Sequence, residues 1–166
     1  MPRSPALAAA TRLAGRALPL MEEWALAAGA EALINAGPVF LPPGGRLPRL
    51  HPMQKNAPLP PRSSTAAVCC FALTMPPAED LDVWFLSLAK QAGHTLIFDF
   101  KMPERNLDYP GALLFSPLRR RLSCGRHVPA GGLEALLYRH RDQCRVLQRR
   151  TLGASALCLV LVQNRD

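Results

Sequence analysis

The chain has 166 residues and a formal net charge of +8, from 20 Lys+Arg against 12 Asp+Glu. This length fits one domain. With 49% hydrophobic and 19% charged residues, the composition excludes a chain that is disordered throughout, because it supplies enough apolar side chains for a core. The longest apolar stretch, 152–162, is about half the length of a membrane-spanning helix of about 20 residues, so no membrane span is expected.

Prolines divide the chain into two parts. Eight of the 17 prolines fall between Pro38 and Pro61, and such a density is incompatible with central strands or long helices. We therefore expect residues 1–62 to be irregular and residues 63–166 to hold most of the regular structure.

The first part still contains local signals. Residues 16–28 carry leucine, methionine and alanine near helical spacing, with Pro19 acceptable in a first turn, and predict a short amphipathic helix. Residues 31–41 form a brief apolar segment that is broken by glycine and proline. Leu50 marks at most an edge strand in the loop that follows.

The second part begins with a strand, a helix and a strand. Residues 66–73 are a continuous apolar run, which is typical of a strand covered on both faces of a parallel sheet. Residues 78–91 start with acids and then place apolar side chains at helical intervals, which predicts a helix. Residues 94–100 form a second apolar strand, so the unit is expected to be a parallel crossover.

The remainder is predicted to be a long loop, a helix and a hairpin. Residues 101–132 contain four prolines and are expected to be a lid, a binding segment or disordered. A basic run at 119–121 fits either an anion contact or a solvated face. Residues 133–141 look helical, and the alternating segment 144–151 pairs with the β-like segment 154–163 in a terminal hairpin.

The basic residues are 17 Arg and only 3 Lys. Arginine excess suits phosphate recognition, but aromatic residues are only 6% and lie mostly in apolar runs, so nucleic acid is not the expected partner. The five cysteines are expected to be buried free thiols, because they include no C-x-x-C pair. Cys124 and His127 are three residues apart, but no metal site is expected.

The N-terminus bears on localisation. Arg3, Arg12 and Arg16 precede the first acid, Glu22, as in a mitochondrial presequence, but no secretory signal core is present. We expect a cytoplasmic protein, with a mitochondrial location as the alternative.

Three segments of the second part carry a family resemblance. Residues 68–76 resemble the fourth strand of one enzyme family's sheet and the loop into the helix that follows that strand. Residues 89–100 resemble the segment that forms the fifth strand of the same sheet. Residues 144–163 resemble the antiparallel sixth and seventh strands that close the sheet. The family is the class I S-adenosylmethionine-dependent methyltransferases, and the resemblance covers about residues 66–163. It implies an α/β fold with a Rossmann-like methyltransferase sheet, mostly parallel, ending in an antiparallel hairpin.

The upstream residues match this family less completely. Residues 53–60 resemble its Q-x-D-A-x-x-L-P stretch, with Asn56 where a carboxylate is usual, and Gly15 resembles the last glycine of its cofactor loop. The first strand and earlier glycines have no counterpart, and residues 32–36 lack the acid that binds the ribose. Since the first strand is central in the family's sheet, its loss would leave ladder groups and apolar faces uncovered unless the N-terminal segment or a partner supplies a replacement. The chain thus resembles a single, truncated or diverged methyltransferase domain.

The resemblance implies S-adenosyl-L-methionine as cofactor and a small molecule as methyl acceptor. The implied cofactor-binding residues are Gly15, Asn56, Ala57, Phe71, Ala72 and Leu73. The last three are included because ligands of open α/β sheets bind beyond the carboxyl ends of strands, and their alternative role is ordinary strand core.

Acceptor contacts are expected after the second apolar strand. Asp99 and Lys101, followed by Glu104, lie at the same edge and are assigned to the substrate, with a solvated loop as the alternative. No catalytic residue is assigned, because methyl transfer mainly requires that donor and acceptor are aligned.

Three functions stay open at this point. The first is methyl transfer to a small molecule. The second is a non-catalytic methyltransferase-like remnant or partner subunit, which the missing glycine-rich loop favours. The third is an RNA-associated basic protein, whose binding would fall steeply with salt. Uncovered sheet edges would also allow a homodimer.

Overall fold

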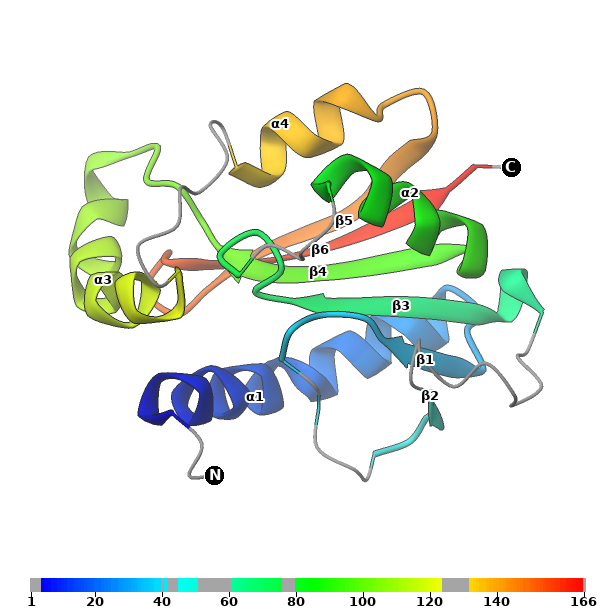
Figure 1. The fold of residues 1–166 in the computed structure, drawn as a ribbon, viewed down its shortest axis with the longest axis horizontal. Coiled ribbons are helices and arrows are strands. Elements are labelled where there is room, and N and C mark those ends of the chain that lie inside the picture. Colours follow the sequence, from blue (N-terminus) through cyan, green and yellow to red (C-terminus); the bar gives the residue numbers. More distant parts are fainter. Residues whose placement is uncertain are drawn as a thin grey trace.

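The structure, a computed structural model, describes residues 4–39, 41, 45–50, 61–75, 80–123 and 132–165. These residues form one six-stranded sheet with helices on both faces (Figure 1). The strands are β1 (Ala32–Asn35), β2 (Arg49–Leu50), β3 (Thr65–Cys70), β4 (His94–Phe100), β5 (Cys144–Leu152) and β6 (Leu157–Asn164). The helices are α1 (Pro5–Ala27), α2 (Leu81–Gln91), α3 (Tyr109–Ser123) and α4 (Gly132–Arg139), with the short 3-10 helices η1 (Arg62–Ser64) and η2 (Asn106–Asp108).

The strands lie in the order β2-β1-β3-β4-β6-β5. The first four are mutually parallel, whereas β6 runs antiparallel to both β4 and β5. The expected α/β class, with a mostly parallel sheet and an antiparallel C-terminal hairpin, is therefore confirmed. The edge strand expected at Leu50 is also present, as β2.

The sheet needs no replacement for the central strand that the family resemblance leaves missing. β1 pairs directly with β3, in a register that runs from Ala32 opposite Thr65 to Asn35 opposite Val68. The two strands satisfy each other's ladder groups, so neither the N-terminal segment nor a partner chain is needed between them. The sheet is continuous from β2 to β5.

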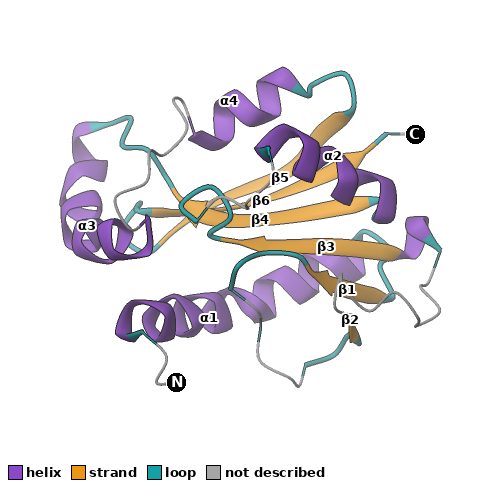
Figure 2. Cartoon of the chain, in the orientation of Figure 1, coloured by secondary structure: helices purple, strands orange, loops and turns teal. Residues whose placement is uncertain are grey.

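The two faces of the sheet are covered by different helices. α1 lies across one face, while α2 and α4 lie on the other (Figure 2). Alternation along β3 explains this arrangement, because Val68 and Cys70 join the cluster that contains α1, whereas Ala67 and Cys69 pack with Leu88 of α2. Both faces of β3 are thus buried, as its continuous apolar sequence predicts.

The first helix is much longer than the segment 16–28 predicts. α1 begins at Pro5, and its buried stripe consists of Ala6, Ala10, Ala14, Ala17 and Met21. These residues recur every three or four positions, so they line one side of the helix, and their small size allows a close approach to the sheet. The prediction missed this because alanines carry little hydrophobic signal.

A buried ion pair ties α1 to the edge strand. Glu22 lies in α1 and its Oε1 is 2.8 Å from an Nη of Arg49 in β2, with both side chains less than a tenth exposed. Its other oxygen accepts a hydrogen bond from the backbone N–H of Arg46 at 2.6 Å. The expectation that residues 1–62 are irregular is therefore wrong in part, because they contain α1, β1 and β2, and the ion pair joins this helix to the edge of the sheet.

The long loop expected over residues 101–132 is also wrong in part, because it contains α3. Phe115 and Leu118 pack against the α1 side of the core, and Leu122 is buried there. Leu113 lies on the opposite side of the helix and Leu114 at the flank of the packed side, and they are 72% and 70% exposed. Apolar residues on both sides obscure the helical period, and Pro110 and Pro117 reinforce the appearance of a loop.

α2 and α4 are joined on their shared face by an ionic contact. Asp82, in the first turn of α2, has its Oδ1 2.6 Å from Nε2 of His140 and 3.0 Å from Nε of Arg139. Burial raises the pKa of Asp82, but the hydrogen bonds from His140 and Arg139 outweigh it, so the pKa lies below the usual carboxyl value. The contact holds α4 beside the sheet.

Two further expectations concern cysteines and membranes. Cys69, Cys70, Cys144 and Cys158 are buried and free, as predicted, while Cys124 lies outside the described residues. No helix in the described part of the chain is long and apolar enough to cross a membrane.

Candidate functional site

The carboxyl ends of β1, β3 and β4 meet at one edge of the sheet because these strands are parallel. The loop after β1 lies close to the end of β3, since a Cβ on Gly37 would be only 2.6 Å from the backbone nitrogen of Cys70. Glycine at position 37 therefore allows the chain's own backbone to fill the space between these two strand ends.

β3 ends in a turn at Phe71, whose φ of 60° lies in the left-handed region that favours glycine. Its N–H donates to the carbonyl of Phe98 at 2.8 Å, and its ring lies 5.3 Å from that of Phe98 and 5.1 Å from that of Phe100. These aromatic contacts explain why a bulky residue is retained there. The predicted strand 66–73 therefore stops at Cys70.

Asp99 organises this turn from the neighbouring strand. Its side chain is buried and accepts hydrogen bonds from the N–H of Leu73 at 2.9 Å, the hydroxyl of Thr74 at 2.7 Å and the N–H of Phe100 at 2.8 Å. Burial raises the pKa of Asp99 above the usual carboxyl value, and these hydrogen bonds oppose only part of that shift. Asp99 therefore fixes the loop after β3 through its hydrogen bonds with Leu73 and Thr74.

The raised pKa of Asp99 predicts a pH effect on stability. Because folding favours the protonated carboxyl, stability is greatest below the ordinary aspartate pKa and falls as the pH rises through the raised value. The Asp99→Asn variant should lack this decrease, while the remaining carboxyls titrate alike in both proteins. Urea unfolding at several pH values measures the difference, and parallel curves for the two proteins would contradict the prediction.

Lys101 follows β4 and is held by two contacts. Its backbone N–H donates to the carbonyl of Ala156 at 2.8 Å, and its Nζ lies 3.5 Å from Asp108. Asp108 also accepts the backbone N–H groups of Glu104 and Arg105, and these bonds, together with Lys101, lower its pKa. These contacts fix the segment that follows β4.

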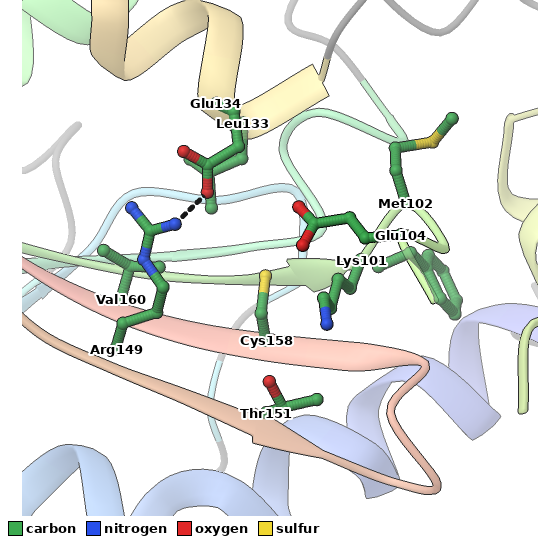
Figure 3. Close-up of a pocket in the computed structure, with 10 residues that line it drawn as sticks. Lys101, Met102, Glu104, Leu133, Glu134, Arg149, Thr151, Cys158 and Val160 are labelled. Carbon is green, nitrogen blue, oxygen red and sulfur yellow. Dashed lines mark hydrogen bonds and ion pairs between the residues drawn. The ribbon is translucent and has the colours of Figure 1, made fainter. Parts of the chain in front are cut away.

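A cavity of about 140 Å³ lies beside this segment, between β4, the β5–β6 hairpin and the first turn of α4 (Figure 3). Its walls are Phe100, Lys101, Met102, Glu104, Leu133, Glu134, Arg149, Thr151, Cys158 and Val160. Glu134 of α4 and Arg149 of β5 form an ion pair at one end of it. Lys101 and Glu104 lie toward the other end (Figure 3).

The pKa of the Cys158 thiol in this cavity is raised. Burial and the nearby Asp99 raise the pKa of Cys158 to about 12. A thiol with that pKa is protonated at neutral pH, and only a thiolate attacks carbon or sulfur centres efficiently. Cys158 therefore supplies a small apolar wall, and the hydroxyl of Thr151 and the charged ends of Lys101 and Glu104 supply the polar groups.

The candidate residues are separated by the fold. Phe71, Ala72 and Leu73 form the buried turn that Asp99 holds, and Lys101 lines the cavity. Asn56 and Ala57 lie outside the described residues. Their assignments to cofactor or substrate stay predictions.

Gly15 lies inside α1 and not in a loop before it. Gly15 lies four residues before Pro19. Inside a helix, the ring of a proline crowds the carbonyl of the residue four positions before it, which here is Gly15. A Cβ on Gly15 would meet nothing within 4 Å, so this glycine makes no close approach to another group of the described chain. Its cofactor role is likewise a prediction.

Sequence reasoning missed the cavity residues of the hairpin. Alternation along β5 places Arg149 and Thr151 on one face, and the hairpin register sets Thr151 opposite Cys158. That much follows from strand period and pairing, but the approach of α4 to this face depends on the tertiary fold.

Comparison with models of known protein families, with curated proteins and with solved structures gives no match to this chain.

Proposed function

We propose that this chain is a methyltransferase-like binding or partner subunit, which holds a small molecule in the cavity after β4. The observation that carries the proposal is the cavity itself, at the carboxyl end of a parallel strand, where ligands of open α/β sheets usually bind. It also adjoins Lys101, which sequence reasoning assigns to the acceptor. The proposal thus retains Lys101 as a residue that contacts the small molecule, and it does not require methyl transfer.

The cavity limits the size and chemistry of the ligand. A volume of about 140 Å³ is close to the roughly 150 Å³ cavity that accommodates benzene. Phe100, Leu133 and Val160 suit an apolar ring, while Lys101 and Glu104 offer one donor and one acceptor. A single ring that bears one polar group, such as a phenol, is the ligand class that fits this lining best.

The described residues at the ends of β1 and β3 do not fit S-adenosylmethionine. The two strands pair directly, the loop at Gly37 packs against Cys70, and Phe71 is 0% exposed. β1 ends at Asn35, so it offers no carboxylate for the ribose hydroxyls. A cofactor at this edge would need groups from outside the described residues, including Asn56 and Ala57.

Methyl transfer from S-adenosylmethionine to a small acceptor is the second candidate. It is favoured by the order of the strands, which is what the family's sheet would give if its central first strand were deleted and the flanking strands joined. Calorimetric titration of folded protein with S-adenosylmethionine and S-adenosylhomocysteine separates the two candidates. We expect no heat and no thermal shift at millimolar ligand, whereas micromolar binding would overturn the binding-subunit proposal in favour of the enzyme.

A matched pair of variants tests the cavity. Thr151→Phe should fill it, whereas Arg150→Phe adds the same ring to the opposite face of β5. Phenol should shift the amide resonances of Lys101 and Cys158 in the wild type and in Arg150→Phe, but not in Thr151→Phe. Equal shifts in all three proteins, or none in the wild type, would overturn the assignment of the ligand to this cavity.

A further inference from the structure

Large apolar side chains are exposed on α3 and on the short helix before it. Leu107 of η2 is 85% exposed and Tyr109 is 52% exposed, while Leu113 and Leu114 are both at least 70% exposed. We call these four residues the α3 surface. An apolar side chain that is exposed singly needs no explanation, whereas a group of them marks an interaction site.

Helical spacing brings the members of the α3 surface together. Tyr109 and Leu113 are four residues apart, so they are neighbours on the outer side of α3, and Leu114 lies beside Leu113 toward the packed side. η2 runs directly into α3, and Leu107 precedes Leu114 by seven residues, which is about two turns. The four side chains therefore form one apolar patch.

The patch is held in place by the inner side of the helix. α3 lies at one end of the molecule (Figure 1), where a Cβ on Gly111 would clash with the backbone carbonyl of Ala154 in the β5–β6 turn. Glycine at position 111 allows this close approach. Phe115 and Leu118 pack against the core on the same side. The α3 surface is thus presented outward by a helix that is fixed to the sheet.

Cations precede and follow the patch in the sequence. Arg105 lies just before η2 and Arg120 lies in the last turn of α3, and both are exposed. The sequence of α3 contains no Asp or Glu. Of the two acids before it, Asp108 is buried and Glu104 lines the cavity after β4. The exposed charge beside the α3 surface is therefore mainly positive.

This combination favours an anionic lipid surface over a second copy of the chain. Two copies that met through this helix would bring Arg105 and Arg120 against cations whichever way the helices ran. Helices that lie in the membrane interface instead combine apolar side chains with Arg or Lys at the anionic headgroups. We propose that the α3 surface binds an anionic membrane, with Leu107, Leu113 and Leu114 entering the headgroup layer. This binding does not depend on a ligand in the cavity after β4.

Cosedimentation of the full chain with lipid vesicles tests the proposal. The wild type should bind vesicles of phosphatidylcholine mixed with phosphatidylglycerol about tenfold or more tightly than vesicles of phosphatidylcholine alone, and salt should weaken this binding. Leu113→Gln/Leu114→Gln should weaken it about tenfold or more, because both leucines leave water on binding. The control Leu26→Gln/Val83→Gln changes exposed apolar residues of α1 and α2 and should bind like the wild type.

A second pair of variants tests the charge. Arg105→Gln/Arg120→Gln should weaken binding to the anionic vesicles about tenfold, whereas Lys90→Gln/Arg145→Gln removes the same charge from exposed positions on α2 and β5 and should have a smaller effect. The proposal is overturned if the wild type does not bind the anionic vesicles, or if either α3 variant behaves like its control.

Sedimentation velocity without lipid covers the competing occupant. The wild type should sediment like the Leu113→Gln/Leu114→Gln variant. A wild-type dimer that this variant dissociates would assign the α3 surface to a second copy of the chain and overturn the proposal.

Discussion

Glu22→Ala should lower the free energy of unfolding by about 3–5 kcal/mol, the typical cost of removing one member of a buried ion pair. Glu22 and Arg49 are 4% and 8% exposed, so the variant leaves a buried guanidinium that has lost this carboxylate. It also removes the acceptor of the Arg46 N–H. Urea denaturation monitored by circular dichroism measures the loss, which is a large part of the roughly 5–15 kcal/mol expected of a whole domain.

Two controls separate charge burial from simple truncation. The double variant Glu22→Leu/Arg49→Met replaces the pair by apolar side chains and should recover most of the loss, since buried pairs are often matched by apolar groups of similar size. Glu134→Gln breaks the exposed pair with Arg149 and should cost less than about 1 kcal/mol. If Glu22→Ala costs no more than Glu134→Gln, the pair does not anchor α1.

Asp99→Ala is the second variant with a large expected effect, about 2–5 kcal/mol, because each buried donor left without an acceptor costs about 1–3 kcal/mol. The N–H groups of Leu73 and Phe100 are inside the protein and lose their carboxylate, whereas the hydroxyl of Thr74 is able to rotate. The turn at Phe71 should loosen with them. Hydrogen exchange at Leu73 and Phe100 reports the local effect, and urea unfolding reports the global one.

Asp99→Asn is the graded control for this turn. One carboxylate oxygen accepts from Thr74 and Phe100 and the other from Leu73, so an amide would keep the first pair and turn an NH₂ group toward Leu73. Exchange should therefore accelerate most at Leu73. Equal protection at Leu73 in the wild type and both variants would show that Asp99 does not hold the turn.

The strands and helices of the second part could be predicted because their local signals agree with the fold. The residues of β4 are buried on both sides and read as one apolar run, 94–100, whose bounds the structure reproduces. α2 begins at Leu81 because the Asp80 side chain accepts from the N–H groups of Asp82 and Val83, a capping signal visible in sequence.

The remainder depended on packing between distant segments. Half of the first ten residues of α1 are alanines, and those of them that are buried form a core-facing stripe only because the sheet covers them. Direct pairing of β1 with β3 could not be predicted either, since ladder partners are set by the whole sheet.

The candidate site shows the same division. The sequence places Asp99 and Lys101 at the end of β4, but their distinct surroundings arise from tertiary contacts. Asp99 accepts hydrogen bonds from the turn after β3, whereas Lys101 contacts Asp108 and lines the cavity. Thr151 and Glu134 follow Glu104 by 47 and 30 residues in the sequence, and only the hairpin and α4 bring them to that cavity.

The position of α1 has a consequence for synthesis in the cell. Its stripe shares one hydrophobic cluster with Leu157, Leu159 and Leu161 of β6, so the core around this helix is completed by a strand that leaves the ribosome much later. Until β6 emerges, that apolar side of the helix lacks part of its cover and is open to chaperones or to association with other chains. This side of the fold should therefore form only after β6 has left the ribosome, and a product that stalls before β6 would be a target for proteolysis.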